Sequence, residues 1–141
     1  MEHLEQLTAA VERGRTGDRA AARHDLGSLW EESTDLQERC AIAHYLADLQ
    51  DDVHAELRWD LRALECVQDD GWLPSLHLNL ADDYRRLAQP GPANEHLEAA
   101  RSRLSELPEG AYGEVIRAGV GHVADALKAG NVRPLESSPS S

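Results

Sequence analysis

The sequence has no phenylalanine, a single lysine (Lys128), two cysteines and no long apolar run. Aromatic residues make up only 4% of its 141 residues, and alanine and leucine supply most of the apolar side chains. The shortage of aromatic and β-branched residues argues against a sheet and favours helices. No stretch approaches the ~18 apolar residues of a membrane span, and the N-terminus lacks the apolar core of a signal peptide. We therefore expect a cytoplasmic protein, and the excess of arginine over lysine indicates a bacterial genome rich in G and C.

The charge and the cysteines exclude further classes of protein. A net charge of −12 argues against nucleic acid or an anionic membrane as partner, because binding phosphates needs clustered lysine and arginine. The acidic residues are spread through the predicted helices, which is typical of a solvated surface. Cys40 and Cys66 lie inside helical patterns without a CxxC spacing, so we expect buried, reduced thiols.

Apolar residues recur at helical spacing in seven segments, which Gly, Pro, Ser and Asp residues separate. Asp18 is a predicted N-cap, and Pro90-Gly91-Pro92 is predicted to be a hard stop between helices. The helices are expected at about 2–13, 18–32, 35–49, 52–68, 74–87, 93–107 and 112–129. The polar Ser/Pro-rich segment 131–141 is predicted to be a disordered tail, which leaves 1–130 as one helical domain.

Small and bulky residues repeat along the chain at matching intervals. Three series of markers advance by 33 and then 38 residues. These markers are Ala10, Ala43 and Ala81, then Ala22, Ala55 and Ala93, and then Leu26, Trp59 and Leu97. Only a small residue fits where two helices cross closely, and stacked helix pairs bury a continuous core that needs a cap at its end. The longer second interval predicts about one extra turn at 67–72, in the fourth helix or its loop.

The stretch LNLADDYRRLAQPGPANEHLEAA resembles the tetratricopeptide repeat. Its matches to the family pattern are Asn79-Leu80-Ala81, Tyr84, Ala93, Leu97 and Ala100. The two earlier units depart from the pattern, with Leu46 and then Arg13 where the family has tyrosine. The resemblance covers residues 2–107. It implies an all-α, right-handed helical-repeat stack, an α-solenoid of about seven antiparallel helices, with the last helix as a cap.

In this family the first helix of each pair lines a concave groove where peptides dock. The resemblance therefore implies an adaptor or regulatory scaffold that binds a peptide or protein partner, without catalytic residues, cofactor or metal. An asparagine amide can pair with a peptide backbone through both donor and acceptor, and arginine can fork onto a carboxylate. The implied groove residues are His44, Asp48, Asn79, Asp82, Arg86 and Arg117.

Two other functions remain open at this point. The chain is a candidate self-associating protein that forms a homodimer. The contact would be an exposed apolar patch made of Trp72, Leu73, Leu76 and Leu78. It is also a candidate small metal-binding protein or thiol enzyme, because Cys40, His44 and Asp48 share one stripe of the third helix. No HExxH, glycine-rich phosphate loop or GxSxG motif accompanies that stripe.

Overall fold

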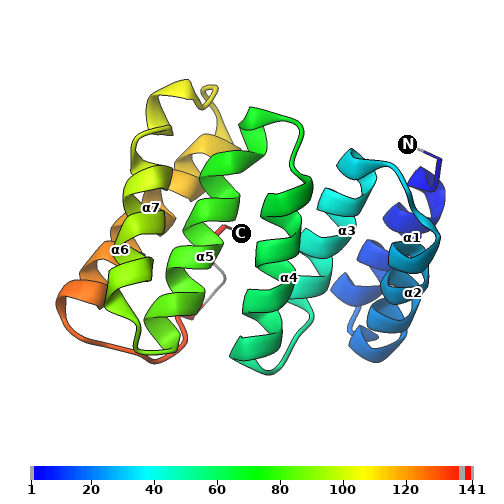
Figure 1. The fold of residues 1–141 in the computed structure, drawn as a ribbon, viewed down its shortest axis with the longest axis horizontal. Coiled ribbons are helices and arrows are strands. Elements are labelled where there is room, and N and C mark those ends of the chain that lie inside the picture. The colour runs from blue at the N-terminus through cyan, green and yellow to red at the C-terminus, as the bar shows by residue number, and fades with distance from the viewer. Residues whose placement is uncertain (1, 137–138, 141) are drawn as a thin grey trace. The chain divides into compact units, whose positions relative to one another are not determined.

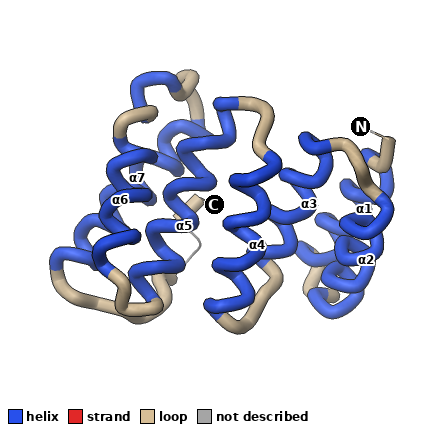
Figure 2. The backbone as a smooth tube through the Cα atoms, viewed as in Figure 1, coloured by secondary structure: helices blue, strands red, loops and turns tan. Residues whose placement is uncertain are grey.

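The structure of the protein is a computed structural model that describes residues 2–136 and 139–140. This part of the chain contains seven α-helices, two short 3-10 helices and no strand, so the predicted all-α class is confirmed (Figures 1 and 2). The elements are α1 (Leu4–Arg15), α2 (Arg19–Glu32), α3 (Leu36–Asp48), α4 (Val53–Cys66), η1 (Asp70–Trp72), α5 (Leu73–Arg86), α6 (Pro90–Arg101), η2 (Leu104–Glu106) and α7 (Ala111–Lys128). None of the described helices is long and apolar enough to cross a membrane.

Packing divides the chain into two compact units, 1–68 and 69–141. In the first unit α1 packs against α2 and α3 against α4, and α3 also contacts α1 and α2. In the second unit α5 packs against α6, and α7 contacts both of them. The core of the second unit is formed by Leu78, Ala81, Leu97, Ala100, Leu107, Ile116, Val120 and Val123.

Aspartate side chains begin three of the helices. Asp18, Asp35 and Asp52 precede α2, α3 and α4, and each accepts a hydrogen bond from a backbone N–H in the first turn. These bonds satisfy donors that no carbonyl within the helix can reach. The predicted cap at Asp18 is therefore confirmed.

The repeat markers are mostly buried. All of the marker alanines except Ala55 are buried, and so are Leu26 and Leu97. Trp59 is partly buried and packs edge-on against Trp30, with 5.2 Å between the ring centroids. The periodic small residues therefore report positions where helices approach closely.

The two ends of the sixth helix differ most from the prediction. Pro90-Gly91-Pro92 is not a stop but the first turn of α6, because proline has no N–H to lose there and its φ is already helical. The sixth helix ends at Arg101, and the single turn η2 replaces the residues predicted to continue it. The extra turn predicted at 67–72 is η1, which lies in the loop rather than in α4.

Helix α5 is ended by Ala88, an alanine in a left-handed backbone conformation that glycine usually adopts. Ala88 has φ +58°, its N–H bonds the Arg85 carbonyl, and the N–H of Gln89 bonds the Tyr84 carbonyl at 2.9 Å. This is the Schellman pattern, in which glycine normally occupies the left-handed residue. A Cβ in that conformation costs roughly 1–2 kcal/mol.

Ala88→Gly is therefore expected to raise the free energy of unfolding by about 1 kcal/mol, because it relieves this strain. The matched control is Ala118→Gly at an exposed position inside α7, which is expected to lower it by about 1 kcal/mol. Urea unfolding of the two variants measures both. Destabilisation by both substitutions would contradict a left-handed conformation at Ala88.

A buried carboxylate fixes the start of the first unit. Glu38 on α3 is only 1% exposed, and it accepts hydrogen bonds from the backbone N–H of His3 at 2.8 Å and from its imidazole at 2.6 Å. Burial raises the pKa of Glu38, but the nearby Ser33 hydroxyl and the hydrogen bonds from His3 outweigh burial and lower that pKa to about 2. The ionised carboxylate thus ties the N-terminal segment to α3.

Because the pKa of Glu38 falls from 4.5 to about 2 on folding, its contribution to stability is complete above pH 4.5. It is lost as the pH falls from 4.5 toward 2. Glu38→Gln is expected to reduce the slope of the free energy of unfolding against pH over that window. The control, Glu31→Gln at an exposed position, is expected to leave that slope unchanged. Urea titrations at several pH values measure the slopes, and equal slopes for wild type and Glu38→Gln would refute this role.

Candidate functional site

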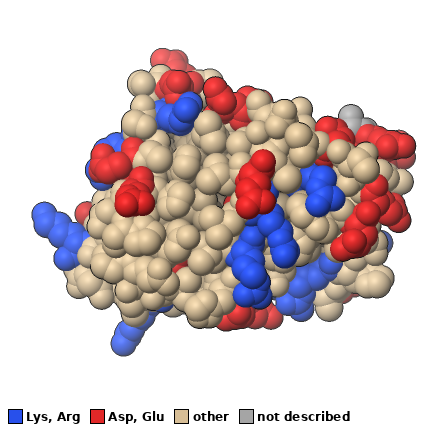
Figure 3. Space-filling model, in the orientation of Figure 1, with Lys and Arg blue, Asp and Glu red and all other residues tan. Residues whose placement is uncertain are grey.

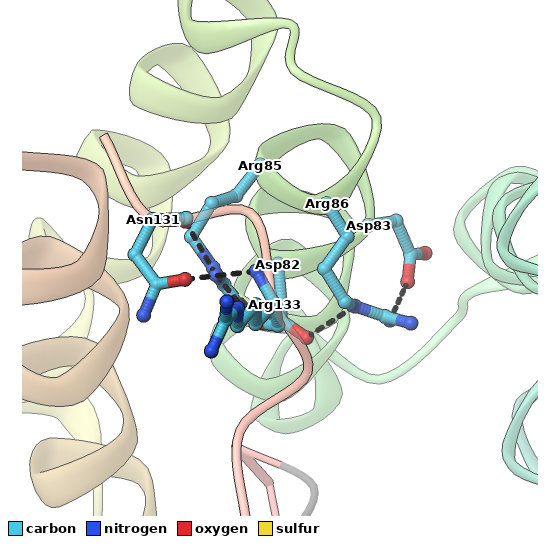
Figure 4. A network of polar contacts seen from close by, with 6 residues as sticks. All are labelled: Asp82, Asp83, Arg85, Arg86, Asn131 and Arg133. Carbon is cyan, nitrogen blue, oxygen red and sulfur yellow. Dashed lines mark hydrogen bonds and ion pairs between the residues drawn. The ribbon is translucent and has the colours of Figure 1, made fainter.

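A buried arginine on α5 organises the polar groups of the second unit. Arg85 is 2% exposed, and its Nε and Nη2 donate to Asp82 Oδ1 at 3.0 and 2.7 Å. Arg86 Nε donates to the other oxygen of Asp82 at 3.0 Å, and Arg86 Nη2 donates to Asp83 at 2.9 Å (Figure 4). A guanidinium can be buried only when its N–H groups find acceptors. Asp82 supplies part of that need.

The remaining nitrogen of Arg85 binds the segment that follows α7. Arg85 Nη1 donates to the backbone carbonyls of Asn131 at 2.7 Å and of Arg133 at 2.9 Å. The N–H of Arg133 bonds Asn131 Oδ1 at 2.9 Å, an Asx turn that places both carbonyls before one nitrogen (Figure 4). Arg85 therefore binds this non-helical segment only through the segment's main-chain carbonyls.

Gly130 turns the chain toward that arginine. It has φ +68°, its N–H bonds the Leu127 carbonyl, and the N–H of Asn131 bonds the Ala126 carbonyl at 2.9 Å. This Schellman ending satisfies the last carbonyls of α7 and reverses the chain without strain, because glycine accepts a positive φ. The tail consequently starts next to Arg85.

Farther along, the tail contacts the core and α7. Leu135 is partly buried and packs against the core cluster. A Cβ added at Gly119 would lie 2.1 Å from the Pro139 carbonyl oxygen and 2.8 Å from Leu78 Cδ2. The main chain at Pro139 therefore passes directly over α7, where only glycine leaves room. The described part of the tail thus lies along α5 and α7.

The predicted disorder of 131–141 stays a prediction. Ser137, Ser138 and Ser141 lie outside the described residues. In the described part, the residues from Asn131 to Glu136 are exposed except for Leu135. The composition that suggested disorder thus coexists with a few specific contacts.

Asn79, a predicted groove residue, lies three residues before Asp82 and on the same face of α5 as Asp82. It is 5% exposed, and neither its side-chain oxygen nor its nitrogen has a hydrogen-bond partner among the described residues. A buried amide without partners costs about 1–3 kcal/mol relative to a paired one. Such a group marks a place where a ligand can supply what the fold does not.

The other predicted groove residues are distributed over both units. Asp82 and Arg86 belong to the network of Arg85. His44 is partly buried on α3 and Asp48 is exposed at the end of that helix. Arg117 on α7 is exposed and donates to the Leu104 carbonyl at 3.3 Å. A shared role for these side chains in a groove remains a prediction.

The stripe of Cys40, His44 and Asp48 lies on α3 as expected. Burial, followed by the neighbouring Cys66, raises the pKa of the Cys40 thiol to about 11, so the thiol is protonated at neutral pH, unlike an activated nucleophile. Burial lowers the pKa of His44, against a smaller opposing effect of Asp48. Among the described residues, these three do not bring three ligand atoms within 4.8 Å of one another.

The apolar patch proposed for self-association is not an exposed surface. Leu76 and Leu78 have no exposed area, and Leu78 is a member of the core cluster. Trp72 and Leu73 are partly buried. The patch therefore gives no support to a homodimer.

Arg85 and the tail were missed by the sequence analysis. The available signal was the register of Arg85, which lies four residues after Ala81 and seven after Leu78, on the core-facing side of α5. A charged residue in that register requires buried partners. The sequence favours the adjacent Arg86, which fits the polar stripe.

Comparisons with protein-family models, with curated proteins and with solved structures give no match for this chain.

Replacing Arg85 tests the buried network. Arg85→Met is expected to lower the free energy of unfolding by about 3 kcal/mol, because the buried Asp82 carboxylate loses two N–H groups. The double variant Arg85→Met/Asp82→Leu is expected to lose less than the sum of the two single variants, since it removes both charges. Urea unfolding of the three variants gives the coupling, and strictly additive losses would rule out a coupled pair.

Proposed function

We propose that this chain is a protein-interaction module whose second unit binds a non-helical peptide segment of a partner protein along α5 and α7. The observation that carries the proposal is the pair of hydrogen bonds from Arg85 Nη1 to the carbonyls of Asn131 and Arg133. A peptide segment already rests on this surface, and it is held by groups that every peptide possesses. The same donor suits a partner's main chain.

Asn79 adds a second recognition element to the proposal. Its amide offers one acceptor and two donor hydrogens, the set that pairs with a peptide C=O and N–H together. A bound main chain would relieve the cost of its buried, unpartnered atoms. Arg85 and Asn79 thus favour a polypeptide ligand over a small molecule without repeating polar groups.

Charge favours a protein over nucleic acid as the partner. The chain carries a net charge of −12. On the face drawn in Figure 3, the surface over α5 and α6 is mostly uncharged, with separate acidic and basic groups. A phosphate backbone requires clustered cations. A peptide with neutral or positively charged side chains suits the net charge of this chain better.

We further propose that the helices form a right-handed stack of antiparallel pairs like that of tetratricopeptide proteins, in a cytoplasmic bacterial adaptor without catalytic activity. The support is the burial of Ala10, Ala43 and Ala81, which lie 33 and then 38 residues apart in the first helix of each pair. The two buried cysteines, Cys40 and Cys66, are free thiols, which suits a reducing compartment.

Asn79→Leu separates binding from folding. Leucine has a similar volume and removes two buried polar atoms without partners, so thermal stability is expected to stay unchanged or to rise. Peptides selected from a displayed random library on the wild-type protein are expected to lose at least tenfold in affinity on Asn79→Leu. Fluorescence anisotropy with labelled peptides measures the loss.

The matched control is Asn94→Leu on α6, where the amide is exposed and bonds the Pro90 carbonyl at 2.9 Å. Selected peptides are expected to bind this variant like wild type. Failure of the library to enrich any peptide, or equal affinity for all three proteins, would refute a peptide site at Asn79.

A further inference from the structure

We propose that the tail from Gly130 to Glu136 is a resident ligand of the α5–α7 surface, and that a partner peptide with the same chemistry binds by displacing it. This inference rests on the proposed function and adds how the site is occupied and which peptides fit it. Its first support is the set of tail contacts, which are those of a docked peptide: two carbonyls on Arg85 and one aliphatic side chain, Leu135, on the core.

The contacts that hold the tail are few, so the tail can leave. Of the residues from Asn131 to Glu136, only Leu135 is partly buried and the others are exposed. The core cluster under the tail contains no tail residue, and Asp82 on α5 itself accepts hydrogen bonds from two nitrogens of Arg85. Weakly packed terminal segments open at low free energy while the core remains folded.

Chemistry defines the kind of peptide that replaces the tail. Arg85 requires two carbonyls that face one nitrogen, a geometry which the Asx turn at Asn131 provides. Pro134 follows, and it restricts Arg133 to extended conformations while supplying no N–H that would need a partner. An aliphatic side chain two residues beyond the second carbonyl then reaches the position of Leu135. We therefore infer a non-helical Pro-Leu segment preceded by Asn or another turn-forming residue.

Gly119 lies where the main chain at Pro139 comes close to α7. A Cβ there would lie 2.1 Å from the Pro139 carbonyl oxygen and 2.8 Å from Leu78 Cδ2, whereas a Cβ at Gly121 on the same helix would meet nothing within 4 Å. Close approach of a backbone is a standard reason for glycine inside a helix that would otherwise be more stable with alanine. The two glycines provide a matched pair for a steric test.

A tethered tail is a strong competitor. A segment joined by a short linker acts at an effective concentration in the millimolar range. The apparent dissociation constant of a partner equals its intrinsic value divided by the fraction of sites that the tail leaves open. Wild-type protein is therefore expected to bind an added tail-like peptide weakly. Releasing the tail is expected to strengthen that binding.

The test uses the full chain and a fluorescent peptide with the sequence of Gly130–Glu136. Leu135→Asp puts a charge where the tail meets the core, and it is expected to bind the probe at least tenfold more tightly than wild type. Val132→Asp is the matched control, because Val132 is 47% exposed and carries the same new charge in the same tail. It is expected to bind the probe like wild type.

A second readout reports the state of the tail directly. Amide order parameters at Val132 and Glu136 are expected to fall below about 0.6 in Leu135→Asp and to stay high in wild type. Gly119→Ala is expected to give tighter probe binding than Gly121→Ala, since the probe ends before Pro139 and avoids the added methyl group. This pair leaves the tail sequence intact.

The possible results separate the two proposals. Equal, tight binding of the probe to wild type and to Leu135→Asp would keep the peptide site and overturn the resident tail. Tail release without probe binding to any variant would overturn both the resident ligand and the proposed peptide-binding function. An ordered tail in Leu135→Asp would overturn the anchoring by Leu135 on which the inference depends.

Discussion

The second unit depends on the burial of one guanidinium. Arg85 cannot be enclosed unless its N–H groups meet acceptors, and the described structure provides these acceptors from two distant parts of the chain. Asp82 comes from the same helix, and the two carbonyls come from residues 46 and 48 positions later. Because of this requirement, the end of α7, its glycine turn and the tail all have defined positions relative to α5.

The same constraint connects folding to recognition. No tail residue belongs to the buried core cluster of this unit, and the tail carbonyls complete the hydrogen bonds of Arg85. A peptide from another molecule can meet the same requirement with its own carbonyls. Asn79, whose side-chain atoms have no hydrogen-bond partner among the described residues, lies on the stripe of α5 that also carries Asp82 and Arg86. Completion of buried polar groups is thus the common physical basis of the tail contact and of the proposed binding.

Local chemistry made the helices predictable. Aspartates before α2, α3 and α4 satisfy the first N–H groups, and periodic alanines mark the close contacts between helices. These features act within a few residues, so the sequence alone reveals them. Pro90 is ambiguous in the sequence because proline both ends one helix and begins the next, and only the left-handed Ala88 shows where the break lies.

The candidate site was predictable only in part. Asn79, Asp82 and Arg86 form a recognisable polar stripe on α5, but the choice between Arg85 and Arg86 depends on partners far along the chain. The tail has the composition of a disordered segment, and its contacts need only Gly130, the Asx turn and Leu135. Such non-local pairing leaves almost no trace in composition or periodicity.

The most direct test of this account is the NMR signal of the Arg85 guanidinium in the wild-type protein. If Nη1 donates to the carbonyls of Asn131 and Arg133, scalar couplings across those hydrogen bonds will be seen to the two carbonyl carbons, and proton exchange at Nη1 will be slow. A rapidly rotating and exchanging guanidinium in a protein whose amide spectrum shows an intact fold would contradict the account.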